Sequence, residues 1–181
     1  MNDKTLLSLN DATPRIADSA FVAPGCRLIG DVEIGEDVSI WYNCVIRADV
    51  NHIRIGARTN IQDGSTIHCD SPHGDSPGYP TIIGEDCLVG HMVLLHGCTL
   101  EDRAFVGMGA MVLNGARIES DGMLAAGAML TAGKLVLSGQ LWAGRPAKFL
   151  RDLTPEEIES NQAGVRGYVQ NGRRHGAALK G

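Results

Sequence analysis

Aliphatic side chains recur at every sixth residue over most of this chain. The longest uninterrupted series ends on an aromatic residue and consists of Leu100, Val106, Val112, Ile118, Leu124, Leu130, Val136 and Trp142. Shorter series with the same step run from Val22 to Ile46 and from Ile55 to Ile67. A sustained internal period indicates a repeat architecture, so it must be interpreted before any local secondary structure.

A period of six residues excludes amphipathic helices, with a period of about 3.6, and alternating strands, with a period of two. It suits a short strand followed by a corner. Three such hexads form one triangular coil, and successive coils stack at the ~4.8 Å strand spacing. Only 4% of the residues are aromatic, so the core must be aliphatic. The sequence therefore predicts an all-β solenoid, a parallel β-helix.

Small residues mark two further positions of the hexad. Two residues before the aliphatic, the chain repeatedly holds Ala, Gly or Cys, as expected for side chains that share a narrow interior. Glycine follows the aliphatic residue at Gly35, Gly56, Gly84, Gly90 and Gly107. We expect the corners to need the permissive backbone of glycine at these points.

The chain has five cysteines and no CxxC pair. Cys26, Cys44, Cys87 and Cys98 fall in the small inward position, where a cysteine acts as a small hydrophobic residue. Cys69 falls outside it, and we expect no chemistry there either. An odd number of cysteines without pairing motifs fits the reducing cytoplasm better than a disulfide framework.

The overall composition narrows the range of partners. The formal net charge of −5 disfavours nucleic acid, since phosphate binding needs a clustered excess of Lys and Arg. No stretch approaches the ~20 apolar residues of a membrane span, so no membrane partner is expected. The first residues lack the basic and then apolar pattern of a signal peptide, so none is expected.

The repeat also predicts the domain boundaries. Thr154 followed by Pro155, Glu156 and Glu157 is typical of a helix start, with a cap, a proline and acidic residues in the first turn. We predict an N-terminal extension over 1–19, a β-helix domain over 20–153 with a loop at 69–80, a C-terminal helix over 154–171 and a loose tail over 172–181.

Two histidines share one register in the repeat. His68 directly follows Ile67, and His96 directly follows Leu95. They are 28 positions apart, but the polar segment Cys69–Pro80 makes the intervening step ten residues too long and must bulge out as a loop. Without that excess, 18 residues remain, which is one full coil. The two imidazoles are therefore predicted to stack at the same corner and to be able to share a metal.

A third histidine lies at a different corner. His91 follows Val89 by two residues and points away from His68 and His96 by about a third of a turn. It can complete their site only from a neighbouring chain, in three prisms packed about a threefold axis. Three histidines and one water are the ligands of a catalytic zinc site. The alternative is that the three are surface histidines that only form hydrogen bonds.

Several motifs resemble the γ-class carbonic anhydrase family, and the match covers about residues 10–175. They are Ile46–Asp49 (IRAD), Asn60–His68 (NIQDGSTIH), Val89–Gly97 (VGHMVLLHG) and Val106–Gly109 (VGMG). Members of that family are left-handed β-helices of hexapeptide repeats. The resemblance therefore implies the handedness, which spacing does not give, because the usual crossover rule favours a right-handed coil.

The resemblance also implies the activity and the ligands. It implies a lyase (carbonate dehydratase) that reversibly hydrates carbon dioxide to bicarbonate. Its metal ligands would be His68, His91 and His96, at the subunit interfaces of a homotrimer. Zn²⁺ is the expected cofactor, and Fe²⁺ or Co²⁺ also suit imidazole ligands. Tyr168, in the C-terminal helix, would match a tyrosine that the family places over the site.

Further site residues follow from the same resemblance. It implies that Arg47 and Asp49, together with Asp63, form charged contacts across subunits near the metal. It implies that Gln62 and Asn60 orient the metal-bound water or bicarbonate, since an amide can both donate and accept hydrogen bonds. A plain ion pair for the charged residues and corner hydrogen bonds for the amides are the alternatives.

One departure from the family concerns proton transfer. The archetype carries glutamates in acidic loops near the metal, whereas the segment 69–80 holds none. Asp70, His73 or Asp75 would have to relay protons instead, and the ordinary pKa of histidine suits that role best. The alternative is a solvated loop, which leaves the rate of turnover open.

Two other classes of function compete with hydration. One is an enzyme of acyl groups on the same scaffold, either an acyl-CoA thioesterase or an acyltransferase. The segment Trp142–Lys148 (WAGRPAK) occurs in several hexapeptide families and does not separate them. Acyltransferases use a single catalytic histidine, whereas three histidines in register favour a metal. The other class is a non-catalytic trimer that keeps its metal for assembly.

Overall fold

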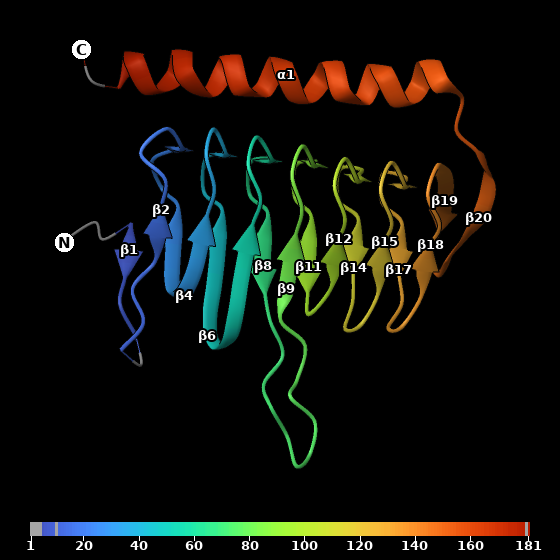
Figure 1. Ribbon diagram of the computed structural model, residues 1–181, viewed down its shortest axis with the longest axis horizontal. Helices are drawn as coiled ribbons and strands as arrows, with labels where there is room; N and C mark the ends of the chain where they lie inside the picture. The colour runs from blue at the N-terminus through green and yellow to red at the C-terminus, as the bar shows by residue number, and fades with distance from the viewer. Residues whose placement is uncertain (1–4, 10, 180) are drawn as a thin grey trace.

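The chain forms a left-handed parallel β-helix of about eight turns, closed along one side by a single C-terminal helix (Figure 1). The computed structural model describes residues 5–9, 11–179 and 181. The solenoid predicted from the six-residue period is therefore confirmed. One face of the coil is an eight-stranded sheet, and the other two faces belong to one twelve-stranded sheet.

The strands are mostly two or three residues long, as the hexad requires. The twelve-stranded sheet contains β1 (Leu6–Leu7), β2 (Arg15–Ile16), β4 (Arg27–Ile34), β6 (Val45–Ile55), β8 (Thr66–His68), β9 (Thr81–Ile83), β11 (Leu94–His96), β12 (Thr99–Leu100), β14 (Met111–Val112), β15 (Arg117–Ile118), β17 (Met129–Leu130) and β18 (Leu135–Val136). The eight-stranded sheet contains β3 (Phe21–Val22), β5 (Ser39–Ile40), β7 (Asn60–Ile61), β10 (Leu88–Val89), β13 (Phe105–Val106), β16 (Met123–Leu124), β19 (Gln140–Gly144) and β20 (Ala147–Asp152). The long strands β4 and β6 run across one corner without a break and so join two faces.

The aliphatic ladder forms the core. Its side chains pair in register from coil to coil, for example Val89 with Val106 and Val106 with Leu124. The largest fully buried side chains are Leu28, Ile40, Ile46, Ile53, Ile61, Ile67, Ile83, Leu95, Leu100, Ile118, Leu124 and Leu130. All five cysteines are buried free thiols, Cys69 included. The packing role predicted for the inward cysteines agrees with this burial.

The glycine after the aliphatic residue is needed for space rather than for an unusual backbone conformation. A Cβ on Gly56 would stand 2.6 Å from the backbone carbon of Gly84, one coil away. The positive φ angles of this corner instead fall on charged residues further along, namely Asp37, Arg58, Asp86, Arg103 and Asp121. The expectation of a permissive backbone at the glycines is therefore wrong, and close stacking of the coils is the reason for them.

These charged corner residues stack with alternating sign. Arg58 makes two hydrogen bonds to the Asp86 carboxylate, and Arg103 makes two to the Asp121 carboxylate. Each pair joins two successive coils. Exposed ion pairs contribute little individually, about 0–1 kcal/mol, but opposite charges in one column disfavour a shifted register.

Helix α1 (Pro155–Ala178) begins where predicted and ends later than predicted. Thr154 caps it, and the capping box with Glu157 is complete. The helix covers the eight-stranded sheet along its whole length and returns to the N-terminal end of the solenoid (Figure 1). No helix in the described part of the chain is long and apolar enough to cross a membrane.

The predicted loose tail over 172–181 is wrong as far as Ala178. Contacts with the first coils extend the helix: Arg173 binds the Asp37 carboxylate, and the hydroxyl of Tyr42 lies 3.0 Å from Nδ1 of His175. The ring of His175 also packs edge-on against Trp41, 5.0 Å between centroids. A sequence stripe of aliphatic residues could not show these aromatic and ionic contacts. Residue 180 lies outside the described residues.

The N-terminal extension predicted over 1–19 partly joins the solenoid. Strands β1 and β2 both pair in parallel with β4, so this segment continues the twelve-stranded sheet. Ile16 of β2 lies six residues before Val22 and pairs with Ile34, so the six-residue step extends one hexad further toward the N-terminus than the predicted series, which begins at Val22. Strand β1 lies outside that step, since Leu6 pairs with Leu28 at a separation of 22 residues. Residues 1–4 and 10 of the predicted extension lie outside the described residues.

The segment 69–80 leaves the coil as a long loop between β8 and β9 (Figure 1). Strands β8 and β9 both pair with β6, so the chain rejoins the same coil that it left. The side-chain amide of Asn51 donates to the carbonyl oxygens of Asp70 and Pro77 and so fastens the base of the loop. The bulge predicted from the excess residues is confirmed.

Replacing Ile118 with Ala tests the aliphatic ladder. Ile118 is fully buried, so we expect the substitution to lower the free energy of unfolding by about 2–5 kcal/mol. Urea denaturation monitored by circular dichroism measures this loss. The exposed Lys134→Ala serves as the control and should change stability by less than about 0.5 kcal/mol. Equal, small effects of both substitutions would show that position 118 does not carry core packing.

Candidate metal centre

His68 and His96 stand side by side at one corner, as their register predicts. They end strands β8 and β11, and their Cα atoms are paired in the ladder between the strands. Nδ1 of His68 lies 3.1 Å from Nε2 of His96. The rings meet edge to face, with 5.0 Å between centroids. We call this corner, with Arg47, Asp49 and Asn114, the two-histidine corner.

The other nitrogen of each imidazole is held by an oxygen. Nε2 of His68 lies 2.9 Å from Oδ1 of Asp49, and Nδ1 of His96 lies 2.5 Å from Oδ1 of Asn114. Both oxygens are acceptors, so both of these ring nitrogens carry the proton. The two nitrogens that face each other are then bare lone pairs. Two lone pairs repel each other at 3.1 Å, so this contact is favourable only with a cation or a proton between the two nitrogens.

The backbone around His68 is fixed from inside the coil. The hydroxyl of the fully buried Thr81 donates to the carbonyl oxygen of His68, at 2.5 Å. The same hydroxyl oxygen accepts from the backbone N–H of Gly97, at 2.9 Å. Thr81 follows the loop directly, so it ties the loop exit to the residues on both sides of the imidazole pair.

Asp49 is an anionic carboxylate in this arrangement. Burial on its own would raise the pKa of Asp49, but hydrogen bonds from His68 and Arg47 outweigh it, and the pKa lies below its ordinary value. Arg47 and Asp49 form an ion pair within one chain. The ion-pair alternative therefore holds here, and a contact to another subunit stays a prediction.

The donor set of the two-histidine corner fits a divalent metal. Two nitrogens on a tetrahedral zinc, each at 2.0–2.1 Å, stand about 3.3 Å apart, close to the observed 3.1 Å. A ring N–H that donates to a carboxylate or carbonyl oxygen is the usual outer support of a metal-binding histidine. Two ligands alone do not complete a site, and a third must come from elsewhere.

His91 lies at a separate corner, as predicted. Its Nδ1 is 3.0 Å from Oδ2 of Asp63, and both side chains are about two-fifths exposed, at 41% and 42%. Within one chain, no group of three metal-binding side chains forms among the described residues. We call this corner, with Asn60, Gln62, Asp63 and Tyr168, the single-histidine corner.

The two amides of the single-histidine corner are fixed by each other. Nε2 of Gln62 donates to Oδ1 of Asn60 at 3.1 Å, and Nδ2 of Asn60 donates to the carbonyl oxygen of Cys87 at 3.3 Å. Asn60 is fully buried, while Gln62 is 4% exposed. Asn60 thus has a structural role in the corner, whereas Gln62 keeps its Oε1 for another donor.

Tyr168 reaches the same corner from helix α1. Its ring packs edge-on against Trp41, with 5.5 Å between centroids. Burial, and secondarily the negative charge of Asp63, raise the pKa of the Tyr168 phenol. Tyr168 is therefore a neutral hydroxyl at physiological pH and lies near Asp63, the partner of His91.

Of the three loop residues considered for proton relay, two are exposed to solvent. His73 and Asp75 are exposed, and Asp70 is half-buried. The backbone of His73 pairs with that of Ser76, which makes a tight turn at the tip. No contact joins these side chains to the imidazole pair within the described chain, so a relay through them stays a prediction.

Asn114 is a site residue that the sequence analysis did not identify. It follows His96 by 18 residues, one full coil, and so continues the column of His68 and His96. The count that placed the two histidines together, carried one coil further, would have found it. An asparagine at a corner carries no metal-ligand signal of its own, and it was passed over for that reason.

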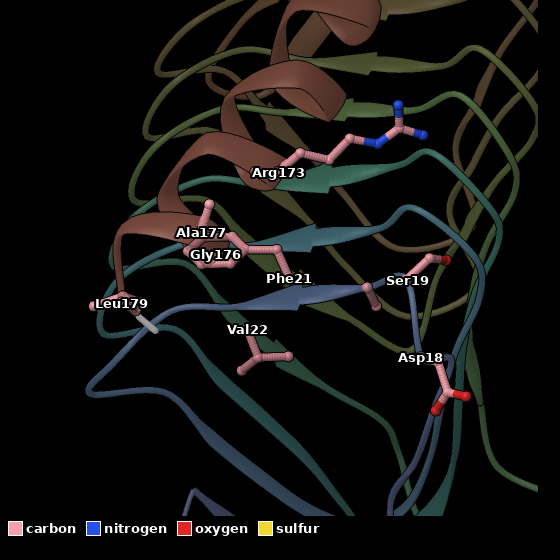
Figure 2. A pocket seen from close by; sticks show the side chains of 10 residues that line it. Asp18, Ser19, Phe21, Val22, Arg173, Gly176, Ala177 and Leu179 are labelled. Atoms are coloured by element: carbon pink, nitrogen blue, oxygen red, sulfur yellow. The ribbon is translucent and has the colours of Figure 1, made fainter. Parts of the chain in front are cut away.

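A groove of about 530 Å³ lies elsewhere, between the last turns of α1 and strand β3 (Figure 2). Phe21 and Val22 form one wall, and Gly176 and Leu179 belong to the other. The described residues that line it include none of the three histidines. The groove is therefore distinct from both histidine corners.

Comparison with protein families supports the repeat. A family described as "Bacterial transferase hexapeptide (six repeats)" matches residues 13–48. A second, described as "Hexapeptide repeat of succinyl-transferase", matches residues 80–114 and 97–132. Together with the fold, these matches define a hexapeptide-repeat protein.

Individual curated relatives identify a narrower family than the repeat does. A carbonic anhydrase of Geobacillus kaustophilus is 49% identical over 165 residues, which cover 91% of this chain and 87% of the relative. The mitochondrial gamma carbonic anhydrase 2 of Arabidopsis thaliana is 43% identical over 172 residues, 95% of this chain. The chain spans only 62% of that plant relative's length.

Two solved structures match nearly the whole chain, and both are named as transferases rather than as carbonic anhydrases. A hexapeptide transferase family protein from Anaplasma phagocytophilum is 45% identical, with a TM-score of 0.87, and covers 96% of this chain and 98% of its own. A putative acetyltransferase of Bacillus cereus is 39% identical, with a TM-score of 0.90, over 96% and 97% of the two chains. On its curated relatives and its motifs, the chain belongs to the γ-class carbonic anhydrase family.

Proposed function

We propose that this protein reversibly hydrates carbon dioxide to bicarbonate with a divalent metal bound by His68, His91 and His96. The observation that carries the proposal is the 3.1 Å approach of two imidazole nitrogens in the two-histidine corner, while the other nitrogen of each ring faces a side-chain oxygen. Zn²⁺ is the proposed metal, with Fe²⁺ or Co²⁺ as substitutes. The names of the curated relatives support the same reaction.

A homotrimer is the proposed assembly. Each chain carries a corner with two ligands and a second corner with one, so neither is complete by itself. If the single-histidine corner of one chain meets the two-histidine corner of the next, cyclic closure makes all sites equivalent. Three triangular prisms around one axis satisfy that condition.

The residues of the chain take distinct parts in this reaction. A divalent cation held by three imidazoles supplies acidity, because it lowers the pKa of a coordinated water to about 7; carbonic anhydrase is the standard case of this effect. Asp49 holds the proton on Nε2 of His68, which leaves Nδ1 to bind. Gln62 has Oε1 available to fix the orientation of the reacting water, and Asn60 fixes Gln62.

Hydration releases one proton for each bicarbonate, and this proton must leave the site. The loop 69–80 directly follows His68 along the chain and carries exposed titratable groups, of which His73 is the proposed relay. The proposed compartment is the cytoplasm, which suits five free thiols.

Acyl transfer is the second candidate, because the solved relatives are named as a hexapeptide transferase and a putative acetyltransferase. A thioesterase on this scaffold belongs to the same class. Assays with acetyl-CoA, with and without an amine acceptor, separate these functions from hydration. A trimer that binds metal and turns over neither substrate would support the non-catalytic alternative.

Removing the metal tests the main proposal. Dialysis against a chelator should abolish carbon dioxide hydration, measured by stopped flow with a pH indicator, and added Zn²⁺, Co²⁺ or Fe²⁺ should restore it. Metal analysis should find about one ion per chain, as one site per interface requires. Hydration that survives complete removal of metal would contradict the proposal.

Replacing Gln62 with Ala separates orientation from metal binding. We expect the variant to retain its metal, because Gln62 is not a ligand, and to lose about tenfold or more in kcat. Metal analysis and stopped-flow hydration measure the two effects. As the matched control, Gln140→Ala removes an amide far along the coil and should leave both unchanged. A Gln62→Ala variant with the parent rate would show that its assignment is wrong.

Mixing two inactive variants tests whether the site spans two chains. His68→Ala and His91→Ala should each be metal-poor alone. Refolded together at equal amounts, they should recover up to about a quarter of the metal, the chance that an interface in a cyclic trimer has the intact donor on both sides. Each variant refolded alone is the control. If verified mixed trimers recover no metal, the ligands do not come from two chains.

A further inference from the structure

The imidazole of His96 is oriented by Asn114. Nδ1 of His96 and Oδ1 of Asn114 are 2.5 Å apart, the shorter of the two contacts that hold the outer nitrogens of the imidazole pair. A histidine without such a partner can place its proton on either nitrogen, and half of its tautomers would then present an N–H where a lone pair is needed. A fixed acceptor at Nδ1 removes that ambiguity.

Asn114 is itself held in place by its surroundings. Its carbonyl oxygen accepts from the backbone N–H of Gly133, one coil further on. A Cβ on Gly97 would stand 2.8 Å from Oδ1 of Asn114 and 2.7 Å from Cβ of Tyr79. Gly97 also has φ of +57°, where other residues are strained. Glycine at 97 therefore leaves the space that the Asn114 amide occupies.

Tyr79 packs beside the two glycines that neighbour Asn114. It comes from the end of the 69–80 loop, and its ring lies against Gly115, where a Cβ would stand 3.0 Å from Cε1. Its backbone carbonyl oxygen accepts from the N–H of Asp70, which keeps the two ends of the loop together. Tyr79 thus contacts Gly97 with its Cβ and Gly115 with its ring, and these two glycines lie beside Asn114.

We propose that Asn114 is a positioning residue of the metal centre, which holds the proton of His96 on Nδ1 so that Nε2 faces His68 as a ligand. This inference rests on the proposed metal-dependent function. Asn114 does not touch the metal or the substrate; it acts through His96, as Asp49 acts through His68.

The neutral amide also sets the charge of the centre. Asp49 already places one carboxylate behind His68, and its anion offsets part of the cation's charge. A second carboxylate behind His96 would offset more of the charge that makes the bound water acidic. Asn114 provides the acceptor without that additional charge.

Two nearly isosteric substitutions test the role. Asn114→Leu removes the acceptor, and Asn114→Asp keeps an oxygen at the same place. We expect Asn114→Leu to weaken Zn²⁺ binding about 10–100-fold in a chelator competition. Asn114→Asp should retain the affinity and move the pH midpoint of hydration upward. Asn171→Leu, which removes a helix asparagine bound to Arg174, is the control and should bind as the parent does.

Imidazole ¹⁵N NMR of the metal-free protein gives a readout that a general loss of stability would not mimic. Nδ1 of His96 should carry a proton in the parent and in Asn114→Asp, also where the two facing nitrogens share a further proton, and should be only partly protonated in Asn114→Leu. Parent-like affinity and tautomer in Asn114→Leu would overturn the positioning role, and an unmoved midpoint in Asn114→Asp would overturn the charge argument. A parent that binds Zn²⁺ but does not hydrate carbon dioxide would refute the proposed function alone.

Discussion

The structure depends on the parallel hydrogen bonding of each coil to the one before it. Because every sixth side chain is a buried aliphatic, a coil cannot slip by one residue without turning its core residues outward. This fixed register turns positions one coil apart into columns. The metal centre is such a column, in which His68, His96 and Asn114 follow one another up a single corner. Residues that lie one coil, or 18 positions, apart in the repeat therefore meet at the same corner, and their spacing in the sequence determines which side chains form a site.

The two corners are unequal halves of one proposed site. The two-histidine corner presents two imidazole nitrogens that face each other at 3.1 Å, and the single-histidine corner presents a partly exposed His91 held by Asp63. The same corner carries the fixed amide of Gln62 and the phenol of Tyr168. In the proposed site, one corner provides two of the metal ligands, and the other provides the third ligand and the amide that orients the water. The proposed assembly brings the two corners together.

Strict periodicity explains which features could be predicted from the sequence. The coil, the 69–80 loop and the His68–His96 contact follow from spacing alone, and Asn114 was within reach of the same count. The full length of α1 was not, because it depends on the contacts of Arg173 and His175 with the first coils. Strand β1 was not predictable in this way, because it joins the sheet outside the six-residue step, whereas Ile16 of β2 is in step and was within reach of the same count.

The 69–80 loop departs from strand β8 and returns as β9 onto the same underlying strand, with its base clasped by Asn51. Its length and composition consequently do not enter the arithmetic that aligns the imidazoles. Changes between Asp70 and Pro77, the two residues clasped by Asn51, can therefore alter what surrounds the centre while Tyr79 and the ligand geometry stay in place. The residues that set the ligand geometry and the loop residues proposed to handle protons thus lie on separate parts of the chain, so each can be changed without the other.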